Sequence, residues 1–490
     1  MARAARIGGS GMSATAAPAA ASRSGLRVAP AAIVAALAAI PPVVFVAFPT
    51  YPQYDSYFHL VWGRAVLHGV SPDFGAYAAP TEHPLYIALG ALVSLLGTAA
   101  GERALVLVTL LSLSALTVAV YRLGERVFGR WPGVAAAAFT GTSFALLLYA
   151  VRAYVDVPFL ALVLWAGALE VARPRRGLLV MALLAAAGLL RPEAWVLIGL
   201  YWLWCGGWRR PALTALAAIA PLGWAAVDAA VTGDPLHSLH ATSSLAETLG
   251  RERGIAKVPR ALVTLLADVA RPPVALLGVA GVALAVRRFG VRRLAVPLAL
   301  LGAGLITFVA TGVAGLPILL RYLTVPAVAL CLFAGYALLG FTTLPAGDVW
   351  RARWARAALI AAVLGAAFVV VKAPSAGKLR DELTFVHRAH DDLVAILHEP
   401  AVERAARCGP ITFPNYRLVP DTRWLLDVPA GRVGARSARR HARGVAIFVL
   451  GQKALKRYGF ADGASPRTNA PDPGFVPVAR NGTFSAYGAC

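Results

Sequence analysis

The sequence has few charged residues and few cysteines for its length. Only 14 % of its 490 residues are Asp, Glu, Lys or Arg, whereas 58 % are hydrophobic. Soluble domains carry about 25 % charged residues, so this composition excludes an ordinary soluble enzyme and a disordered chain. Four cysteines in 490 residues also exclude a disulfide framework. The sequence contains no Walker-type phosphate loop, no GxGxxG motif after a strand and no zinc-finger spacing.

Long apolar segments make up much of the chain. Apolar runs of about 17–25 residues are typical of transmembrane helices. A further run at 84–99 is ambiguous, and we expect a re-entrant or interface-lying helix there. The pattern predicts a polytopic α-helical membrane protein of about 11 spans, at 29–48, 103–121, 131–150, 157–172, 178–190, 194–206, 212–231, 273–286, 294–313, 316–341 and 357–373.

The positive charge indicates how these spans are oriented. The net charge is +23, and 42 of the 47 basic residues are arginine. Arginine-rich connections face the cytoplasm, and here they fall in every second connection. If 84–99 spanned the membrane, giving twelve spans and a cytoplasmic C-terminal tail, most clusters would face outward. We therefore expect a bacterial inner-membrane protein with a cytoplasmic N-terminus and no nucleic-acid partner. The clusters lie at 122–130, 173–176, 209–210, 287–293 and 351–356.

The chain divides into a cytoplasmic tail (1–28), a transmembrane domain (29–373) and an extracytoplasmic α/β domain (374–490). Two long outer loops interrupt the transmembrane domain, at 49–83 and 232–272. Outside the cytoplasm a disulfide between Cys408 and Cys490 is permitted, and two unpaired thiols are the alternative. Within the C-terminal domain the pattern predicts a helical stretch at 379–407 and strands at 410–420, 444–451 and 475–490.

The first outer loop is predicted to contain an amphipathic helix over residues 51–69. Asp55 and His59 lie four residues apart and share a polar face of this helix. This face is either solvated or holds a carboxylate at the membrane surface as a general base. The opposite face suits the membrane interface and contains Tyr54, Tyr57, Phe58, Val61 and Ala65.

Other ionisable side chains are predicted to gather at the same outer face. Each costs about 2.5–3.5 kcal/mol at membrane depth, so each needs a structural or functional reason. Asp156 either stabilises a helix start or acts as a second carboxylate. In the second case it shares a divalent cation with Asp55 or divides the base and positioning roles with it. Arg321 either extends to the interface or binds a lipid phosphate. Those two residues are joined at the outer face by Glu82, His83, Arg191, Glu193 and Tyr322.

Arg191 and Glu193 flank a proline between two short spans. They form either a simple ion pair at a turn or a contact for a sugar or phosphate group. Tyr322 serves as a hydrogen-bond donor or an interfacial anchor. His237 and His240, three residues apart in the second loop, are more typical of solvated histidines than of a metal site.

In this order, the motifs resemble the GT-C superfamily of membrane glycosyltransferases that use polyprenyl-phosphate sugars, such as protein O-mannosyltransferases and the lipid A aminoarabinose transferase. The resemblance extends over residues 30–340 and concerns the arrangement of helices and loops. It rests on Asp55, Glu82-His83-Pro84-Leu85, RLGERVFGR at 122–130, Asp156 and Arg321-Tyr322-Leu323. The family often has two prolines where this sequence has only Pro84.

The resemblance implies a GT-C-like fold and transfer of a sugar from a polyprenyl-phosphate donor to a cell-envelope glycan, lipid or protein hydroxyl. It implies a catalytic or metal-binding role for Asp55, with Asp156 as its partner. We expect the substrate to contact His59, Glu82, His83, Arg191, Glu193, Arg321 and Tyr322. A transporter or lipid flippase would instead predict charges near mid-span and internal repeats. A scaffold protein would tolerate replacement of Asp55 and Asp156.

Overall fold

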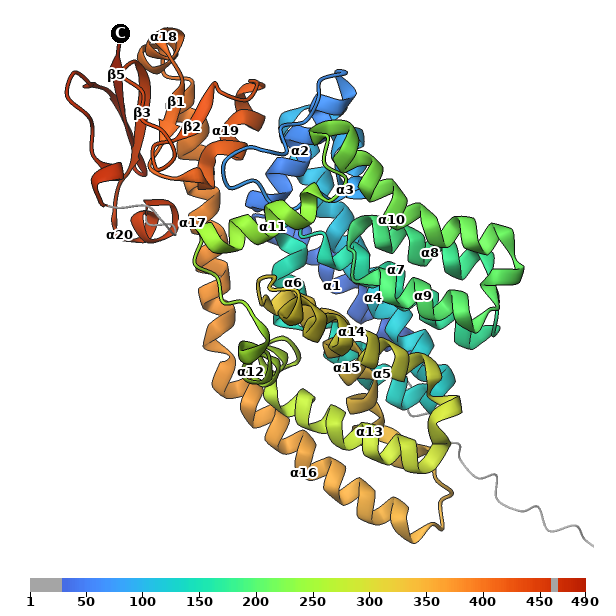
Figure 1. Ribbon diagram of the computed structural model, residues 1–490. Helices are drawn as coiled ribbons and strands as arrows, with labels where there is room; N and C mark the ends of the chain where they lie inside the picture. The colour runs from blue at the N-terminus through green and yellow to red at the C-terminus, as the bar shows by residue number, and fades with distance from the viewer. Residues whose placement is uncertain (1–28, 460–465) are drawn as a thin grey trace, which may run out of the picture.

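The computed structural model describes residues 29–459 and 466–490; the predicted cytoplasmic tail, 1–28, lies outside them. The described chain is a bundle of helices with a small sheet domain at one end (Figure 1). The first half of the bundle contains α1 (Pro30–Ala47), α2 (Tyr54–Leu67), α3 (Pro84–Ser94), α4 (Thr98–Phe128), α5 (Arg130–Gly141), α6 (Phe144–Val151), α7 (Asp156–Ala172), α8 (Leu178–Leu190) and α9 (Ala194–Trp204).

The second half of the bundle connects to the sheet domain through two consecutive helices, α16 and α17 (Figure 1). The short 3-10 helix η3 (Leu320–Leu323) leads directly into α15. The helices of this half are α10 (Pro211–Thr232), α11 (His237–Thr248), α12 (Val258–Ala270), α13 (Pro272–Arg293), α14 (Ala295–Val313), α15 (Thr324–Leu339), α16 (Val349–Lys372) and α17 (Pro374–Leu397).

Within the described residues, seven helices are long and apolar enough to cross a membrane. The pair α5–α6 adds an eighth if it is one span bent by 51°. The predicted runs at 157–172, 178–190 and 194–206 correspond to the shorter helices α7, α8 and α9, of 17, 13 and 11 residues. All eleven predicted runs therefore lie on helices, and the chain is a polytopic membrane protein.

The ambiguous run at 84–99 becomes α3, a helix of 11 residues. At 1.5 Å per residue it is about 16 Å long, roughly half of a bilayer core of about 30 Å. The chain turns at 95–97 and enters α4 at Thr98. Helix α9, which lies on a predicted span, has the same length, so the expectation that 84–99 does not cross the membrane stays a prediction.

Helix α4 connects the two ends of the bundle. Near its start, the carbonyl of Thr98 accepts a hydrogen bond from Trp424 of the C-terminal domain at 3.3 Å. Near its end, the carbonyl of Val127 accepts one from Arg293 at 3.2 Å. The arginine clusters at 122–130 and 287–293 therefore meet at the end of α4 that is remote from the C-terminal domain.

Helices α2 and α3 pack with their backbones almost in contact. A Cβ atom at Gly63 would lie 2.3 Å from the backbone nitrogen of Ala91, and one at Gly90 would lie 2.3 Å from the carbonyl oxygen of His59. Only glycine permits this approach. The contact fixes α2, which carries Asp55, against the bundle.

Helix α2 is more deeply buried than the sequence predicts. His59, on the face expected to be polar, is 1 % exposed, and every residue from Ser56 to Gly63 is buried. Helix α3 covers one side of α2, and α19 (Val419–Leu426) of the C-terminal domain covers another. The second cover comes from a segment some 360 residues away, so the local pattern could not reveal it.

The C-terminal domain is an α/β unit with a five-stranded sheet of order β2-β1-β3-β5-β4. Strand β1 pairs in parallel with β2 and β3, and β5 pairs antiparallel with β3 and β4. A disulfide joins Cys408 to Cys490, with Cα atoms 5.3 Å apart. The strands are β1 (Ile411–Phe413), β2 (Val433–Ala435), β3 (Gly444–Val449), β4 (Val476–Arg480) and β5 (Phe484–Ala489).

Two details of the predicted domain are wrong. The run 410–420 is a strand only over Ile411–Phe413, because the chain then turns at Pro414 and enters α19, which has Pro420 in its first turn. The helical stretch 379–407 is divided between α17 and α18 (Pro400–Cys408), since a proline opens the second helix. The predicted strands at 444–451 and 475–490 are confirmed as β3 and the hairpin of β4 and β5.

Candidate active site

A cavity of about 510 Å³ opens between the helical bundle and the C-terminal domain. Asp55 at the start of α2 and Arg321 in η3 line it from the bundle. The second outer loop closes part of it with α11, and the C-terminal domain forms the remaining wall. Those two parts contribute Thr242, Leu245, Leu249, Arg251, Tyr416, Arg417, Asp421, Arg457 and Tyr458.

Asp55 and Arg321 form an ion pair in this cavity, with Oδ2 of Asp55 3.1 Å from Nη1 of Arg321. They lie 266 positions apart in the chain. Both side chains remain partly accessible. The sequence predicted that both would lie at one site, and the structure brings them into contact.

Arginine dominates the charge of the cavity. Besides Arg321, the lining includes Arg152, which follows α6, and Arg251, Arg417 and Arg457. Nε of Arg152 is buried without a hydrogen-bond partner in the described chain. A guanidinium group suits bidentate binding of phosphate or carboxylate. The cavity is therefore built to receive an anionic group.

The last three of these arginines were not predicted as site residues. Arg321, Arg417 and Arg457 each stand beside a tyrosine in the sequence, and these three pairs lie at the site. A fourth pair, Tyr121-Arg122, lies near the other end of α4, so the dipeptide alone does not identify the site. Arg251 has no such signal.

Asp156, Arg191 and Glu193 form a second group, which is buried behind the cavity. Arg191 donates hydrogen bonds to both carboxylates. Asp156 is the first residue of α7, while Arg191 and Glu193 lie in the connection between α8 and α9. The cavity lining does not include them. The sequence correctly grouped these residues, but the structure places them outside the cavity that holds Asp55.

Tyr322 connects this buried group to the cavity. The guanidinium of Arg191 lies 5.5 Å from the centre of the Tyr322 ring. A small void of about 10 Å³ is lined by Glu193, Arg321 and Tyr322 together. The buried network therefore supports the segment that carries Arg321.

His59 and His83 stack on one another behind Asp55. Their ring centres are 5.1 Å apart at an interplanar angle of 15°. Nδ1 of His59 lies 2.5 Å from the backbone carbonyl of Asp55. Burial lowers the pKa of His59 to about 4 and holds the pKa of His83 well below its usual value. Both rings are therefore neutral at pH 7, and neither lines the cavity.

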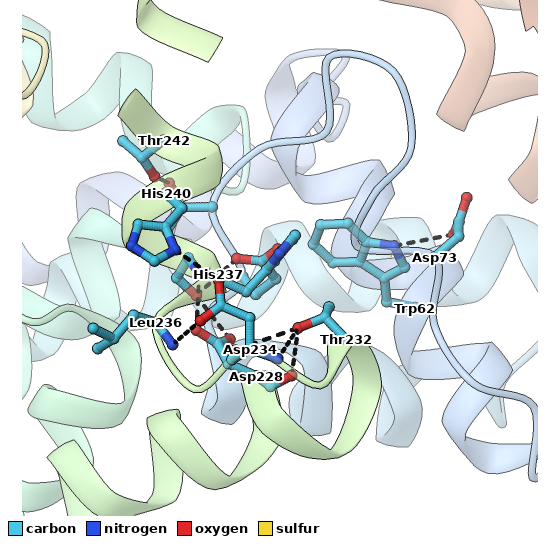
Figure 2. Close-up of polar contacts among 12 residues, drawn as sticks. Trp62, Asp73, Asp228, Thr232, Asp234, Leu236, His237, His240 and Thr242 are labelled. Carbon is cyan, nitrogen blue, oxygen red and sulfur yellow. Dashed lines mark hydrogen bonds and ion pairs between the residues drawn. The ribbon is translucent and has the colours of Figure 1, made fainter. Parts of the chain in front are cut away.

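Glu82 lies in a third group, at the junction of the first loop with α10 and α11 (Figure 2). The hydroxyl of Ser238 lies 2.8 Å from Glu82 and 2.9 Å from Asp228, and it accepts a hydrogen bond from Trp224 at 2.7 Å. His237 lies 3.4 Å from Glu82. Burial raises the pKa of Glu82 to about 7. One hydroxyl proton cannot serve two carboxylates, so this contact requires a proton on Glu82 or Asp228.

The same junction ties the second outer loop to the first. The hydroxyls of Thr81 and Thr242 are 2.8 Å apart, and Figure 2 shows Thr242 and His240 on α11 above Asp234 and Asp228. His240 pairs with Asp234 at the surface, as expected for a solvated histidine. Glu82 therefore helps to hold the wall of the cavity together and does not line the cavity itself.

The arrangement does not favour a cation shared by Asp55 and Asp156. Asp55 binds Arg321, and Asp156 binds Arg191. Within residues 29–459 and 466–490, no group of three or more His, Cys, Asp or Glu side chains is placed to hold a metal ion. A guanidinium thus already occupies the position beside each carboxylate where such a cation would bind.

No family model matches the sequence, and no curated protein matches it. Among solved structures, ArnT from Cupriavidus metallidurans bound to undecaprenyl phosphate is similar, with a TM-score of 0.51 and 15 % identity over 93 % of this chain and 97 % of that chain. The apo form of the Archaeoglobus fulgidus oligosaccharyltransferase gives a TM-score of 0.49 and 13 % identity, over 84 % of this chain and 64 % of that chain. At such identity the similarity to ArnT concerns the fold, and the chain accordingly has a GT-C-like fold with a C-terminal α/β domain.

Proposed function

We propose that this protein transfers a sugar from a polyprenyl-phosphate donor to a hydroxyl group of a cell-envelope glycan, lipid or protein. The observation that carries the proposal is the Asp55–Arg321 pair in an arginine-lined cavity at one end of an apolar bundle. A lipid-linked sugar phosphate needs both features, because its tail lies in the membrane and its phosphate needs positive charge.

The chemistry requires charge stabilisation more than a cofactor. The acceptor oxygen attacks C1 of the sugar while the bond from C1 to the phosphate oxygen breaks. The electron pair of that bond leaves with the lipid phosphate, and the acceptor hydroxyl gives its proton to a carboxyl group in the cavity. Arg321 is placed to stabilise the leaving phosphate, and Asp55 holds its guanidinium in place.

The other predicted residues receive supporting roles in this proposal. Asp156, Arg191 and Glu193 keep Tyr322 and Arg321 in position. His59 and His83 seat the first turn of α2. Direct contact of these residues or Glu82 with substrate stays a prediction. A divalent cation likewise stays a prediction, and the proposed reaction has no step that passes through one.

Two further observations support the donor class and the location. The similar ArnT structure contains undecaprenyl phosphate. The arginine clusters at 122–130 and 287–293 lie at the end of the bundle opposite the C-terminal domain. By the positive-inside rule, this arrangement supports our proposal that the cavity and that domain lie outside the cytoplasm, in a bacterial plasma membrane.

Transfer of labelled sugar by the purified protein tests this proposal. Polyprenyl-phosphate donors carrying different sugars are incubated with envelope fractions as acceptors. We expect Asp55→Asn to reduce transfer by about 10²–10³-fold, because Arg321 loses the carboxylate that holds it beside the leaving phosphate. Asp268→Asn is the matched control, because that aspartate is exposed and lies outside the cavity.

A flippase makes the opposite prediction. It would move a fluorescent polyprenyl phosphate across proteoliposomes without breaking the sugar–phosphate bond. Sugar transfer that fails with every donor while lipid movement occurs would reject the proposed function.

A further inference from the structure

The cavity contains a second carboxyl group, which comes from the C-terminal domain. Asp421 stands in the first turn of α19 and lines the cavity together with Asp55. Its Oδ1 is buried and has no hydrogen-bond partner in the described part of the chain. A buried carboxyl oxygen without a partner is costly unless a ligand or a proton satisfies it.

Helix α19 is firmly attached to the bundle. Arg423 of α19 pairs with Asp73 of the first loop at 2.6 Å, and Asp73 also accepts a hydrogen bond from Trp62 of α2 at 3.2 Å (Figure 2). Arg64 of α2 donates to the carbonyl of Trp424 at 3.0 Å and lies over its ring. These contacts fix Asp421 relative to α2 and therefore relative to Asp55.

The two cavity carboxyl groups differ in their neighbours. Asp55 already has a cationic partner, because it is paired with Arg321. Asp421 forms no ion pair within the described residues, because the guanidinium of nearby Arg457 instead bonds Glu382 and the hydroxyl of Tyr51. Asp421 is thus free to exchange a proton.

The surroundings of Asp421 are mainly phenolic and apolar. Burial raises its pKa to about 8, and the charge of Arg457 opposes this shift. A carboxyl group with a pKa near the working pH suits general base catalysis. The titratable and charged groups that face it are Tyr54 and Tyr57 of α2, Glu102 of α4, His390 of α17, and Arg457 and Tyr458.

We infer that Asp421 is the catalytic base, which takes the proton of the acceptor hydroxyl, while Asp55 serves the donor side through Arg321. This inference rests on the proposed function. As the acceptor oxygen bonds to C1 of the sugar, its O–H bond breaks and the proton passes to a carboxylate oxygen of Asp421. The electron pair of the broken C1–O bond leaves with the lipid phosphate at Arg321. The acceptor therefore binds between the bundle and the C-terminal domain.

A structural role for Asp421 makes different predictions. An acidic residue in a first helical turn stabilises the helix through its dipole. If Asp421 has only this role, Asp421→Asn should lower the unfolding temperature and leave the pH dependence of the reaction unchanged. The base role instead predicts a change in the pH profile at an unchanged unfolding temperature.

The test compares Asp421→Asn, Asp421→Glu and the control Asp268→Asn in the full-length protein. Binding of undecaprenyl phosphate, thermal unfolding and sugar transfer between pH 5.5 and 9 are measured for each. We expect Asp421→Asn to bind undecaprenyl phosphate within about threefold of wild type and to lose about 10²–10⁴-fold in transfer, the range for general base catalysis. Asp421→Glu should recover part of the loss.

The pH profile decides the role. Wild-type transfer should rise with pH, reach half of its maximum near the pKa of about 8 and level off above it, and the residual transfer of Asp421→Asn should lack this rise. The inference is overturned if Asp421→Asn keeps wild-type transfer or the wild-type profile, or if its loss only follows a lower unfolding temperature. If the wild type itself neither binds undecaprenyl phosphate nor transfers sugar, the proposed function fails first.

Discussion

Two arginine–carboxylate pairs lie close together in this molecule, and they differ in what else can reach them. Asp55 and Arg321 are 26 % and 19 % exposed and line the large cavity. Asp156 and Arg191 are 0 % and 3 % exposed, and Glu193 shares the same guanidinium. The first pair is open to a ligand, whereas the second has only protein around it.

We therefore assign a chemical role to the exposed pair and a structural role to the buried pair. A partly exposed ion pair contributes only about 0–1 kcal/mol to stability, so replacing it should cost little stability. A buried pair is costly to break, because removing one partner leaves an uncompensated charge. The two pairs should therefore respond in opposite ways to substitution.

The largest effect on stability is expected for Arg191→Met. It leaves Asp156 and Glu193 buried without their cation, which should lower the free energy of unfolding by about 3–5 kcal/mol. Thermal unfolding of the purified protein measures this. An unfolding temperature equal to that of wild type would remove the distinction between the two pairs.

Arg321→Lys should have a smaller effect on stability and a large effect on function. Lysine keeps the charge beside Asp55 but loses the planar fork that suits phosphate. We expect a loss of about 10–100-fold in affinity for undecaprenyl phosphate and little change in unfolding temperature. Unchanged binding by Arg321→Lys would show that Arg321 does not contact the phosphate.

Glu82→Gln tests whether the junction of the loops stores a proton. Burial raises the pKa of Glu82 to about 7 from its ordinary value of 4.5. At a pH between these two values, the folded protein keeps a proton on Glu82 that the unfolded chain has released. Wild-type stability should therefore fall as the pH rises from 4.5 to 7. Glu82→Gln should flatten this dependence, as measured by unfolding at several pH values. A slope equal to that of wild type would contradict the assignment.

Gly63→Ala tests the contact between α2 and α3, and its effect reaches the site only through α2. The added methyl would meet the backbone of Ala91, so α2 must shift, at a cost of about 1–3 kcal/mol. Because Asp55 is carried by α2, transfer should fall together with stability. Gly69→Ala offers a contrast, since it has open space but a positive φ. A Gly63→Ala protein with full activity would show that the α2–α3 contact does not position Asp55.

Much of the fold could be predicted from the sequence because the signals are local. Apolar runs located the helices, including the short helix α3. The grouping of Asp55 with Arg321 followed from the expected alternation of connections across the membrane. The Asp156–Arg191–Glu193 group followed from the same reasoning, although its separation from the cavity did not.

The contribution of the C-terminal domain could not be predicted. Asp421 and Arg417 lie some 360 residues from Asp55, and no periodicity or spacing reports how a separate domain docks. The burial of α2 and the choice of a disulfide for Cys408 and Cys490 depend on the same tertiary contacts. These are the features that a structure adds to the sequence.

The sharpest test compares Asp55→Asn with Asp156→Asn in one sugar-transfer assay and one unfolding assay. We expect Asp55→Asn to lose about 10²–10³-fold in transfer with an unfolding temperature near that of wild type. We expect Asp156→Asn to be mainly destabilised, with transfer reduced in proportion to the unfolded fraction. A fully active Asp55→Asn protein would contradict the assignment of chemistry to the exposed pair and support to the buried one.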